Sequence, residues 1–441
     1  MTEKKDKTIH LVRGMKDILP ADQPWWDFVR SRGRDLAKSY GYDRIDTPML
    51  EQTNLFIRSV GKGTDIVEKE MFSFIDQGNE NVTLRPEATA GIVRAYIEHG
   101  LVNQPKPVKL FWLGPLFRHD RPQAGRYRQF WQLDYEALGD DHPAVDAELI
   151  MIAYGLLKEL GLSPTVQINS IGDEDDRERY KKALVEYFRP RRNQLSEEVK
   201  KRLQKNPLRV LDSKEEAVRI LVQDAPQIVD YLSETANKHF VKVLEHLDEL
   251  EIPYVLNPRL VRGLDYYNRT VFELWSQDDE GGQLAFGGGG RYDSLVEQLG
   301  GQPTPAAGFA IGFERLIMKM REANVPLPPA HTPNIFVAQL GEASRKKCLK
   351  LFEELRRAGV YAAHALSKDG IKQQMEAANR LKVKYTLIFG QKEMLDNTIL
   401  LRDMDNGIQE TIPFEKVVPE VKKRLERSAL KENHSSTSPE V

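Results

Sequence analysis

Two apolar runs on either side of a polar turn constrain the fold of this chain more than any other feature. The runs cover residues 108–117 and 130–138, and the turn between them is rich in arginine, glutamine, proline and glycine. Strand-like runs joined by such a turn are typical of a β-hairpin. The sequence therefore predicts a long antiparallel hairpin over residues 108–139.

The return strand of this hairpin carries polar side chains in a regular pattern. Gln132, Asp134 and Glu136 alternate with other residues after Phe130, so all four share one face of a strand. Polar groups buried there without partners would be costly, so we expect this face to line a site or to contact solvent as an exposed ribbon. Arginines lie at the end of the first strand and around the turn: Arg118, Arg121, Arg126 and Arg128.

A second polar cluster precedes another strand-like run. Residues 262–267 read Arg-Gly-Leu-Asp-Tyr-Tyr, and the strand pattern follows at 270–275. Arginine offers a planar fork of donors to phosphate or carboxylate oxygens, and tyrosine combines an apolar wall with a polar tip. The cluster suits a small anionic ligand with an aromatic part, although a structural corner closed by a salt bridge has the same composition.

Three shorter segments also carry polar or glycine-rich signals. Glu87 and Thr89 follow Pro86 at the expected start of a helix, where they could cap that helix or bind a ligand amine. Arg315 lies in the first turn of a helix that follows a strand of small residues, where it could hold a terminal phosphate. The glycines at 287–290 do not fit the dinucleotide-binding pattern and indicate close backbone packing or approach to a ligand.

Composition excludes several classes of protein. The 441 residues are too many for one ordinary core, so two or three domains are expected. With 64 basic and 66 acidic residues, the chain lacks the overall positive field of a non-specific nucleic-acid binder. The single cysteine, Cys348, excludes an internal disulfide and a cysteine-built metal site, and its amphipathic surroundings predict a buried thiol. We expect a cytoplasmic location, because the first ten residues do not form a secretory signal and no apolar run approaches membrane-spanning length.

Local patterns divide the chain into segments. They predict a helix over 21–40, an extended segment over 41–50 that Pro48 confines to an edge, and a strongly charged helical stretch over about 170–250. The charged stretch is either an inserted helical subdomain or an exposed helical pair. A proline-rich linker at 324–333 precedes alternating strands and helices, which indicate a small α/β domain.

In order and spacing, these clusters resemble the motifs of the class II aminoacyl-tRNA synthetases, and among them the bacterial-type histidyl-tRNA synthetase family. The class motifs correspond to the region of Pro48, to 117–136 and to 307–316. The histidine-specific motifs correspond to RGLDYYN at 262–268 and GGGGRYDSL at 287–295.

The resemblance runs from about Val12 to about residue 427. It implies an α+β catalytic domain built on an antiparallel sheet with a helical insertion, followed by an α/β anticodon-binding domain. The implied domains are 1–327 for catalysis, with the insertion at about 170–250, a proline-rich linker at 328–334, the anticodon-binding domain at 335–427, and a disordered tail at 428–441.

The resemblance also implies a reaction: ATP-dependent ligation of L-histidine to tRNA(His) through a histidyl-adenylate, with Mg²⁺ accompanying ATP as substrate and no metal site in the protein. Arg118 and Arg262 would be catalytic, Arg118 at the α-phosphate and Arg262 between that phosphate and the histidine carboxylate. The implied histidine-binding residues are Glu87, Thr89, Gln132, Glu136, Tyr266 and Tyr267. The implied ATP-binding residues are Arg118, Arg121, Arg126 and Arg315.

The family is homodimeric, and the helix at 21–40 with the strand near Pro48 would form the interface. The chain departs from the family pattern at Asp120, Trp131 and Asp134, and Asp120 is one methylene shorter than the glutamate usual there. The alternatives are a non-catalytic histidyl-synthetase-like regulatory or sensor protein and a tRNA-binding protein without chemistry. Such regulatory relatives typically lose active-site residues or the C-terminal domain, and this chain keeps both.

Overall fold

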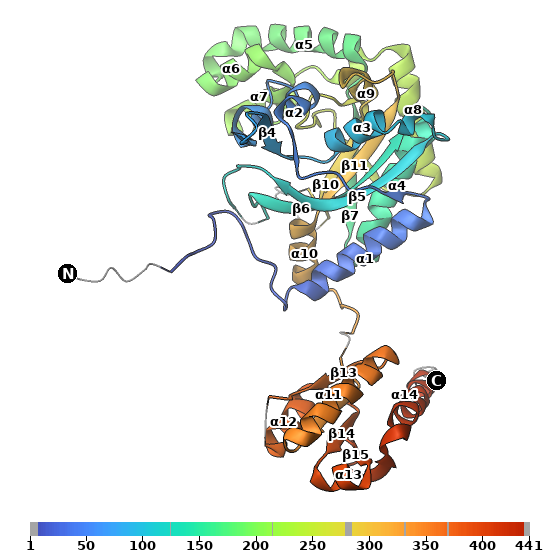
Figure 1. Cartoon of the computed structure of the whole chain (residues 1–441). Helices are drawn as coiled ribbons and strands as arrows, with labels where there is room; N and C mark the ends of the chain where they lie inside the picture. The colour runs from blue at the N-terminus through green and yellow to red at the C-terminus, as the bar shows by residue number, and fades with distance from the viewer. Residues whose placement is uncertain are drawn as a thin grey trace, which may run out of the picture. The chain divides into compact units, whose positions relative to one another are not determined.

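The computed structural model describes residues 8–123, 125–213, 215–277, 285–329, 332–367 and 370–435. The chain divides into two compact units, residues 1–328 and 329–441 (Figure 1). Among the described residues, no helix combines the length and the apolar character needed to cross a bilayer.

An eight-stranded sheet forms the centre of the first unit. Its strand order is β1-β5-β6-β11-β10-β9-β7-β8. The interior pairs are antiparallel, and the outermost pairs, β1 with β5 and β7 with β8, are parallel. The strands are β1 (Asp43–Arg44), β5 (Val108–Phe117), β6 (Gln129–Leu138), β7 (Pro164–Ser170), β8 (Tyr254–Leu256), β9 (Asn268–Ser276), β10 (Gly287–Arg291) and β11 (Ala306–Gly312). The predicted antiparallel sheet is confirmed.

The predicted hairpin is β5 and β6. Their register runs from Val108 opposite Leu138 to Phe117 opposite Gln129, so the two strands pair over their whole length. β5 is buried along most of its length, which explains why it reads as a nearly continuous apolar run. Polar and apolar side chains alternate along the return strand, β6, because its two faces contact different parts of the protein.

One face of the sheet is covered by α1 (Gln23–Ser39), α4 (Pro143–Glu159), α8 (Glu234–Glu249) and α10 (Phe313–Glu322). In α1, Trp26, Val29, Gly33 and Ala37 recur at helical spacing and are buried. Figure 1 shows α1 and α10 below the sheet. The helix predicted at 21–40 is confirmed.

The opposite face is covered by α3 (Thr89–Glu98), α9 (Leu295–Gln298) and most of the charged stretch, with α5 (Glu174–Phe188), α6 (Glu197–Lys205) and α7 (Glu216–Gln223). Tyr180, Leu184 and Phe188 of α5 are buried, so these helices share a core with the sheet. The last helix of the stretch, α8, differs, because its buried Phe240, Val243 and Leu247 pack in the core of the other face. The stretch at 170–250 therefore contributes to both layers.

A second, three-stranded sheet lies beside this layer. It pairs β2 (Leu50–Gln52), β4 (Asn81–Leu84) and β3 (Phe72–Ile75) in that order. Between β2 and β3 the chain forms α2 (Thr53–Val60) and a short π-helix, Ile66–Glu70. This sheet carries exposed apolar side chains, among them Leu50, Phe74 and Ile75.

The second unit has a five-stranded sheet of order β13-β12-β14-β15-β16, with its own core. Its elements are β12 (Ile335–Gln339), α11 (Glu342–Arg357), β13 (Ala362–His364), α12 (Ile371–Arg380), β14 (Tyr385–Phe389), α13 (Gln391–Asp396), β15 (Thr398–Asp403), β16 (Gln409–Pro413) and α14 (Val417–Ser435). The predicted α/β unit is confirmed. Cys348 is buried in α11, and burial raises the pKa of its thiol to about 12, so the thiol is unreactive at neutral pH.

The prediction of a disordered tail from Ser428 was wrong for its first residues. Helix α14 continues to Ser435, and residues 436–441 lie outside the described part of the chain. The sequence at 429–432, Ala-Leu-Lys-Glu, consists of strong helix formers, so the helix extends despite its polar composition. Residues 330 and 331 of the predicted linker also lie outside the described part.

Candidate active site

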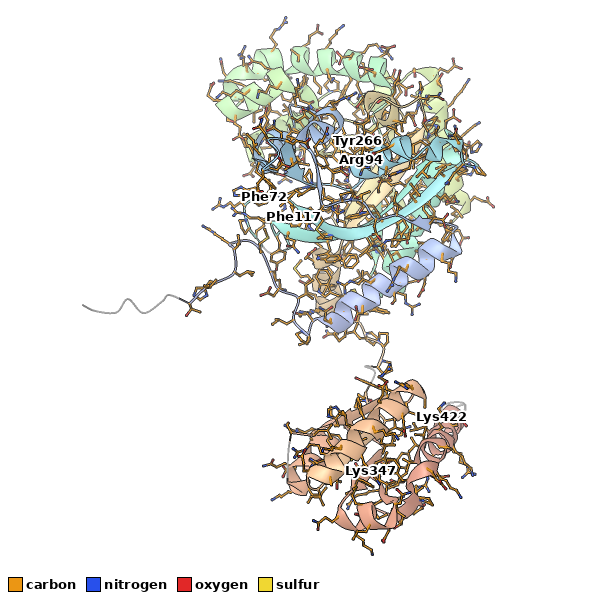
Figure 2. All side chains as sticks on the ribbon, in the orientation of Figure 1. Phe72, Arg94, Phe117, Tyr266, Lys347 and Lys422 are labelled. Carbon is orange, nitrogen blue, oxygen red and sulfur yellow. The ribbon has the colours of Figure 1, made fainter. Side chains whose placement is uncertain are left out.

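A cavity of about 420 Å³ lies in the first unit, against β6, β10 and β11. Every predicted site residue except Arg121 lines it: Glu87, Thr89, Arg118, Arg126, Gln132, Glu136, Arg262, Tyr266, Tyr267 and Arg315. Tyr266 is labelled within the first unit in Figure 2. Segments separated by more than two hundred residues thus contribute side chains to one cavity.

The polar face of β6 forms one wall of this cavity. Phe130, Gln132, Asp134 and Glu136 all line it, as the period-two pattern predicts. The alternative of a solvated ribbon is wrong for this face, because Asp134 and Glu136 are almost completely buried.

Glu136 is held from two sides. The Thr89 hydroxyl donates to Glu136 Oε1 at 2.7 Å, and the Tyr292 hydroxyl donates to Glu136 Oε2. Burial raises the pKa of Glu136 to about 8, although both hydrogen bonds oppose this rise. Opposite Glu136 on β11 stands Gly308, where a Cβ atom would come within 1.5 Å of Glu136 Oε2. Only glycine leaves room for the carboxyl group.

Glu87 caps the helix that supplies Thr89. The Ala90 backbone N–H donates to Glu87 Oε1 at 2.9 Å, which satisfies one free amide of the first turn of α3. The other oxygen, Oε2, is buried and has no hydrogen-bond partner among the described residues. Glu87 therefore caps the helix and keeps one acceptor for another group.

Aromatic rings close the cavity around these carboxyl groups. The ring centroids of Tyr266 and Tyr267 lie 4.7 Å apart, and those of Tyr266 and Tyr292 lie 5.6 Å apart. All three tyrosines are buried. Sequence reasoning assigned no role to Tyr292, although it lies within the GGGGRYDSL motif.

Half-buried arginines occupy another part of the cavity lining. Arg118 Nε donates to the Pro86 carbonyl at 2.8 Å, and the guanidinium group lies 5.2 Å from the Phe130 ring centroid. Arg315 Nη1 donates to the Ala285 carbonyl at 2.7 Å. Burial lowers the pKa of Arg315, and the neighbouring charges of Arg126 and Arg118 lower it further. Such a group of cations is suited to an anion with several charges, such as a polyphosphate.

Arg262 is paired with a residue that sequence reasoning missed. Its Nη1 lies 2.5 Å from Glu273 Oε1, and its guanidinium group lies 5.7 Å from the Tyr267 ring centroid. Glu273 also lines the cavity. The glycine-rich β10 permits this arrangement, since a Cβ atom at Gly288 would come within 2.9 Å of Arg262 Nη1.

The two arginines of the hairpin turn, Arg121 and Arg126, have different surroundings. Arg126 lies 3.2 Å from Asp120 Oδ2 and lines the cavity, whereas Arg121 is exposed and does not line it. The Arg121 backbone N–H donates to Asp120 Oδ1 at 2.6 Å, so Asp120 organises the turn that directs Arg121 to solvent. Trp131 packs against Trp26 on the other face of the sheet.

Within the described part of the chain, no group of three or more His, Cys, Asp or Glu side chains is arranged to hold a metal ion. Arg291, which follows the glycines of β10, is completely buried and lies 2.5 Å from Asp146 Oδ2 in α4. This ion pair joins β10 to α4, and neither residue lines the cavity.

Family models match both units. The histidyl-tRNA synthetase model matches residues 14–316, and the anticodon-binding domain model matches residues 334–424.

Individual proteins match over nearly the same length. A histidine–tRNA ligase of Dehalococcoides mccartyi (strain 195) is 45% identical over 94% of this chain and 99% of its own length. A histidine–tRNA ligase of Geobacillus sp. (strain WCH70) is 42% identical over 94% of this chain and 98% of its own length. The crystal structure of the S. aureus histidyl-tRNA synthetase without ligands has a TM-score of 0.78 and 35% identity, and the match covers 94% of this chain and 99% of that chain. This chain therefore belongs to the histidyl-tRNA synthetase family.

Proposed function

We propose that this chain ligates L-histidine to tRNA(His) with ATP, through a histidyl-adenylate, and releases AMP and pyrophosphate. The observation that carries this function is the composition of one cavity, which combines buried carboxyl groups, three tyrosines and a group of arginines. The carboxyl groups and tyrosines suit an amino acid with a nitrogen-containing ring, and the arginines suit the phosphates of ATP. The family match supports the same reaction.

At the amino-acid end of the cavity, Glu136 accepts a hydrogen bond from an imidazole N–H. The Tyr267 hydroxyl forms a hydrogen bond with the other ring nitrogen, and the Tyr266 ring packs against the imidazole. Glu87, Thr89 and Gln132 receive the α-ammonium group. An aliphatic amino acid would leave Glu136 buried without its ligand partner, and this cost is the basis of the proposed specificity.

At the nucleotide end, Arg118 contacts the α-phosphate and Arg315 the γ-phosphate, with Arg126 near the outer phosphates. Arg121 does not belong to this set, because it is exposed and does not line the cavity. Arg262 lies between the histidine carboxylate and the α-phosphate. It stabilises the negative charge that grows there as a carboxylate oxygen attacks phosphorus and pyrophosphate departs.

The second step transfers histidine from the adenylate to the 3′ end of the tRNA. A ribose hydroxyl attacks the histidyl carbonyl carbon, the bond to the phosphate oxygen breaks, and AMP leaves. The protein contributes position and charge neutralisation to both steps.

ATP brings Mg²⁺ with it in this proposal. Glu273 and Glu314 line the cavity and offer oxygen atoms, the donors that Mg²⁺ prefers, so the cavity fits a metal bound mainly through phosphates. Mg²⁺ would neutralise phosphate charge. Burial raises the pKa of Glu314 to about 7, and its carboxyl group accepts the Trp131 backbone N–H at 3.0 Å.

We further propose a cytoplasmic homodimer in which the second unit binds the anticodon of tRNA(His) and the helices at 170–250 lie near its acceptor arm. The apolar side chains on and beside the three-stranded sheet support a self-association surface near Pro48. Met49, Leu50, Phe74 and Ile75 are each 45–63% exposed.

The amino-acid activation step is tested with Arg262→Ala in histidine-dependent ATP–pyrophosphate exchange. We expect exchange to fall by about a hundredfold or more, because a cation placed at the developing charge is lost. The matched control is Arg259→Ala, in the same loop, since Arg259 is exposed and does not line the cavity. Near-normal exchange by Arg262→Ala would contradict the proposed role.

A further inference from the structure

Asp134 is a buried carboxyl group to which the proposed reaction gives no role. It is 1% exposed and lines the cavity between Gln132 and Glu136 on β6. Its Oδ1 is buried without a hydrogen-bond partner among the described residues. An unpaired buried carboxyl group costs stability, so its presence in a cavity requires an explanation.

The described residues around Asp134 do not supply that partner. Its neighbours in the sheet are Trp112 on β5 and Ala310 on β11, whose side chains offer no charged group. The charges of Arg118 and Arg85 act on Asp134, but both guanidinium groups donate their hydrogen bonds elsewhere. Arg118 donates to the Pro86 carbonyl, and Arg85 donates to the carbonyls of Pro115, Thr47 and Pro48 and to the Thr47 hydroxyl. Burial, followed by the neighbouring Glu136 and Glu87, raises the pKa of Asp134 well above its usual value. A cationic ligand would offset that cost.

The two unpartnered oxygens in this wall indicate which ligand group fits. Among the residues that the structure describes, Glu87 Oε2 and Asp134 Oδ1 both lack hydrogen-bond partners, whereas both oxygens of Glu136 already accept hydrogen bonds from Thr89 and Tyr292. A primary ammonium group has three N–H donors and a positive charge. Glu87, Asp134 and the amide oxygen of Gln132 together offer three acceptors along the cavity wall.

We infer that Asp134 is an additional positioning residue for the substrate, and that its carboxylate receives the α-ammonium group of histidine together with Glu87. The inference rests on the proposed function, because it takes histidine as the ligand. Asp134 thereby adds a charged contact to the cavity wall formed by β6. The contact selects for a free α-ammonium group and contributes nothing to recognition of the imidazole ring.

The test compares three ligands as reactants or competitors in histidine-dependent ATP–pyrophosphate exchange. Histidine carries both the ammonium and carboxylate groups, histidinol keeps only the ammonium, and imidazolepropionate keeps only the carboxylate. In Asp134→Asn, the KM for histidine and the inhibition constant of histidinol should rise by about tenfold or more, since a charged hydrogen bond is lost. The inhibition constant of imidazolepropionate and the KM for ATP should stay within about twofold, a change too small to represent a lost charged contact.

Three results would overturn the inference: equal weakening of all three ligands, weakening of imidazolepropionate alone, or no weakening at all. Asp134→Ala serves as the second variant, and it should show the same selective loss. Thermal unfolding without ligands is the structural control. Because Asp134 Oδ1 has no hydrogen-bond partner in the described part of the chain, both variants should unfold at or above the wild-type temperature. A marked decrease would reveal a structural role instead.

Glu148→Gln is the matched control, because Glu148 pairs with Lys109 outside the cavity and should leave all ligand constants unchanged. The absence of histidine-dependent exchange in the wild-type protein would count against the proposed function itself. It is therefore distinguishable from a failure of the role of Asp134.

Discussion

Glu136 is a buried carboxyl group that lowers the stability of the folded chain at neutral pH and that contacts the ligand in the proposed function. Burial raises its pKa to about 8, and burial also raises the pKa of Glu87 and Asp134. The ordinary pKa of a glutamate carboxyl group is 4.5. Between about pH 4.5 and about pH 8, the folded chain therefore keeps a proton on Glu136 that the unfolded chain has released. Unfolding then releases a proton, and stability contributed by this group decreases as pH rises through that window.

Glu136→Gln should remove this pH dependence. Glutamine has no proton to lose, so the unfolding temperature of the variant relative to the wild type should become steadily higher between about pH 5 and about pH 8. A constant offset, caused by altered contacts with Thr89 and Tyr292, does not change this slope. Thermal unfolding without ligands across the pH range is the measurement, and a difference that stays constant would show that Glu136 ionises normally in the folded chain.

At the scale of single residues, the sequence predicts side chains that belong to a recognisable motif, and it misses the side chains that pair with them in the fold. The period-two pattern correctly places Gln132 and Glu136 on the cavity wall. Tyr292 was missed because its partner, Glu136, lies 156 residues away in the sequence. Glu273 lies only 11 residues from Arg262, but no local pattern indicates that these two side chains pair. Arg121 differs from Arg126 only through the course of the turn, which composition does not determine.

Among the secondary-structure elements, β11 limits the size of the side chains that fit on the neighbouring strand β6. Gly308 on β11 stands opposite Glu136, and a side chain there would occupy the position of the carboxyl group. Gly308 is therefore required by packing, since it leaves room for the buried carboxyl group of Glu136 on the face of the sheet.

Gly308→Ala should displace Glu136 and raise the KM for histidine, with a loss of stability of about 1–3 kcal/mol from overpacking. The contrasting variant is Gly155→Ala in the interior of α4, where a Cβ atom meets no other atom within 4 Å. It should stabilise the chain by about 0.5–1 kcal/mol and leave the KM unchanged. Urea unfolding and exchange kinetics measure both effects, and equal behaviour of the two variants would contradict the packing argument.

Elements with strong local periodicity were predictable, and those defined by distant contacts were not. The hairpin β5–β6 and helix α1 follow directly from their apolar patterns. The pairing of β7 with β9 joins segments about a hundred residues apart, and the packing of α8 on the opposite face from α5 depends on the complete sheet. No local signal carries this information.

For the whole molecule, each unit has its own sheet and its own buried core. All the described residues that line the cavity belong to the first unit. Activation of histidine and recognition of the tRNA anticodon are therefore expected to reside in separate parts of the chain.

A fragment comprising residues 1–328 should retain histidine-dependent ATP–pyrophosphate exchange within about tenfold of the full chain, because its cavity and core are complete. The same fragment should charge tRNA(His) far less efficiently, since it lacks the anticodon-binding unit. Circular dichroism verifies that the fragment is folded. A folded fragment without exchange would mean that the second unit contributes to the chemistry of activation.

The most direct test of the central claim is aminoacylation of tRNA(His) by the full chain, with each of several amino acids supplied separately with ATP and Mg²⁺. We expect efficient charging with histidine, and charging with aliphatic amino acids lower by a factor of about 10⁴ or more, because their binding leaves buried polar groups unpaired. No charging with histidine, or comparable charging with another amino acid, would contradict the account.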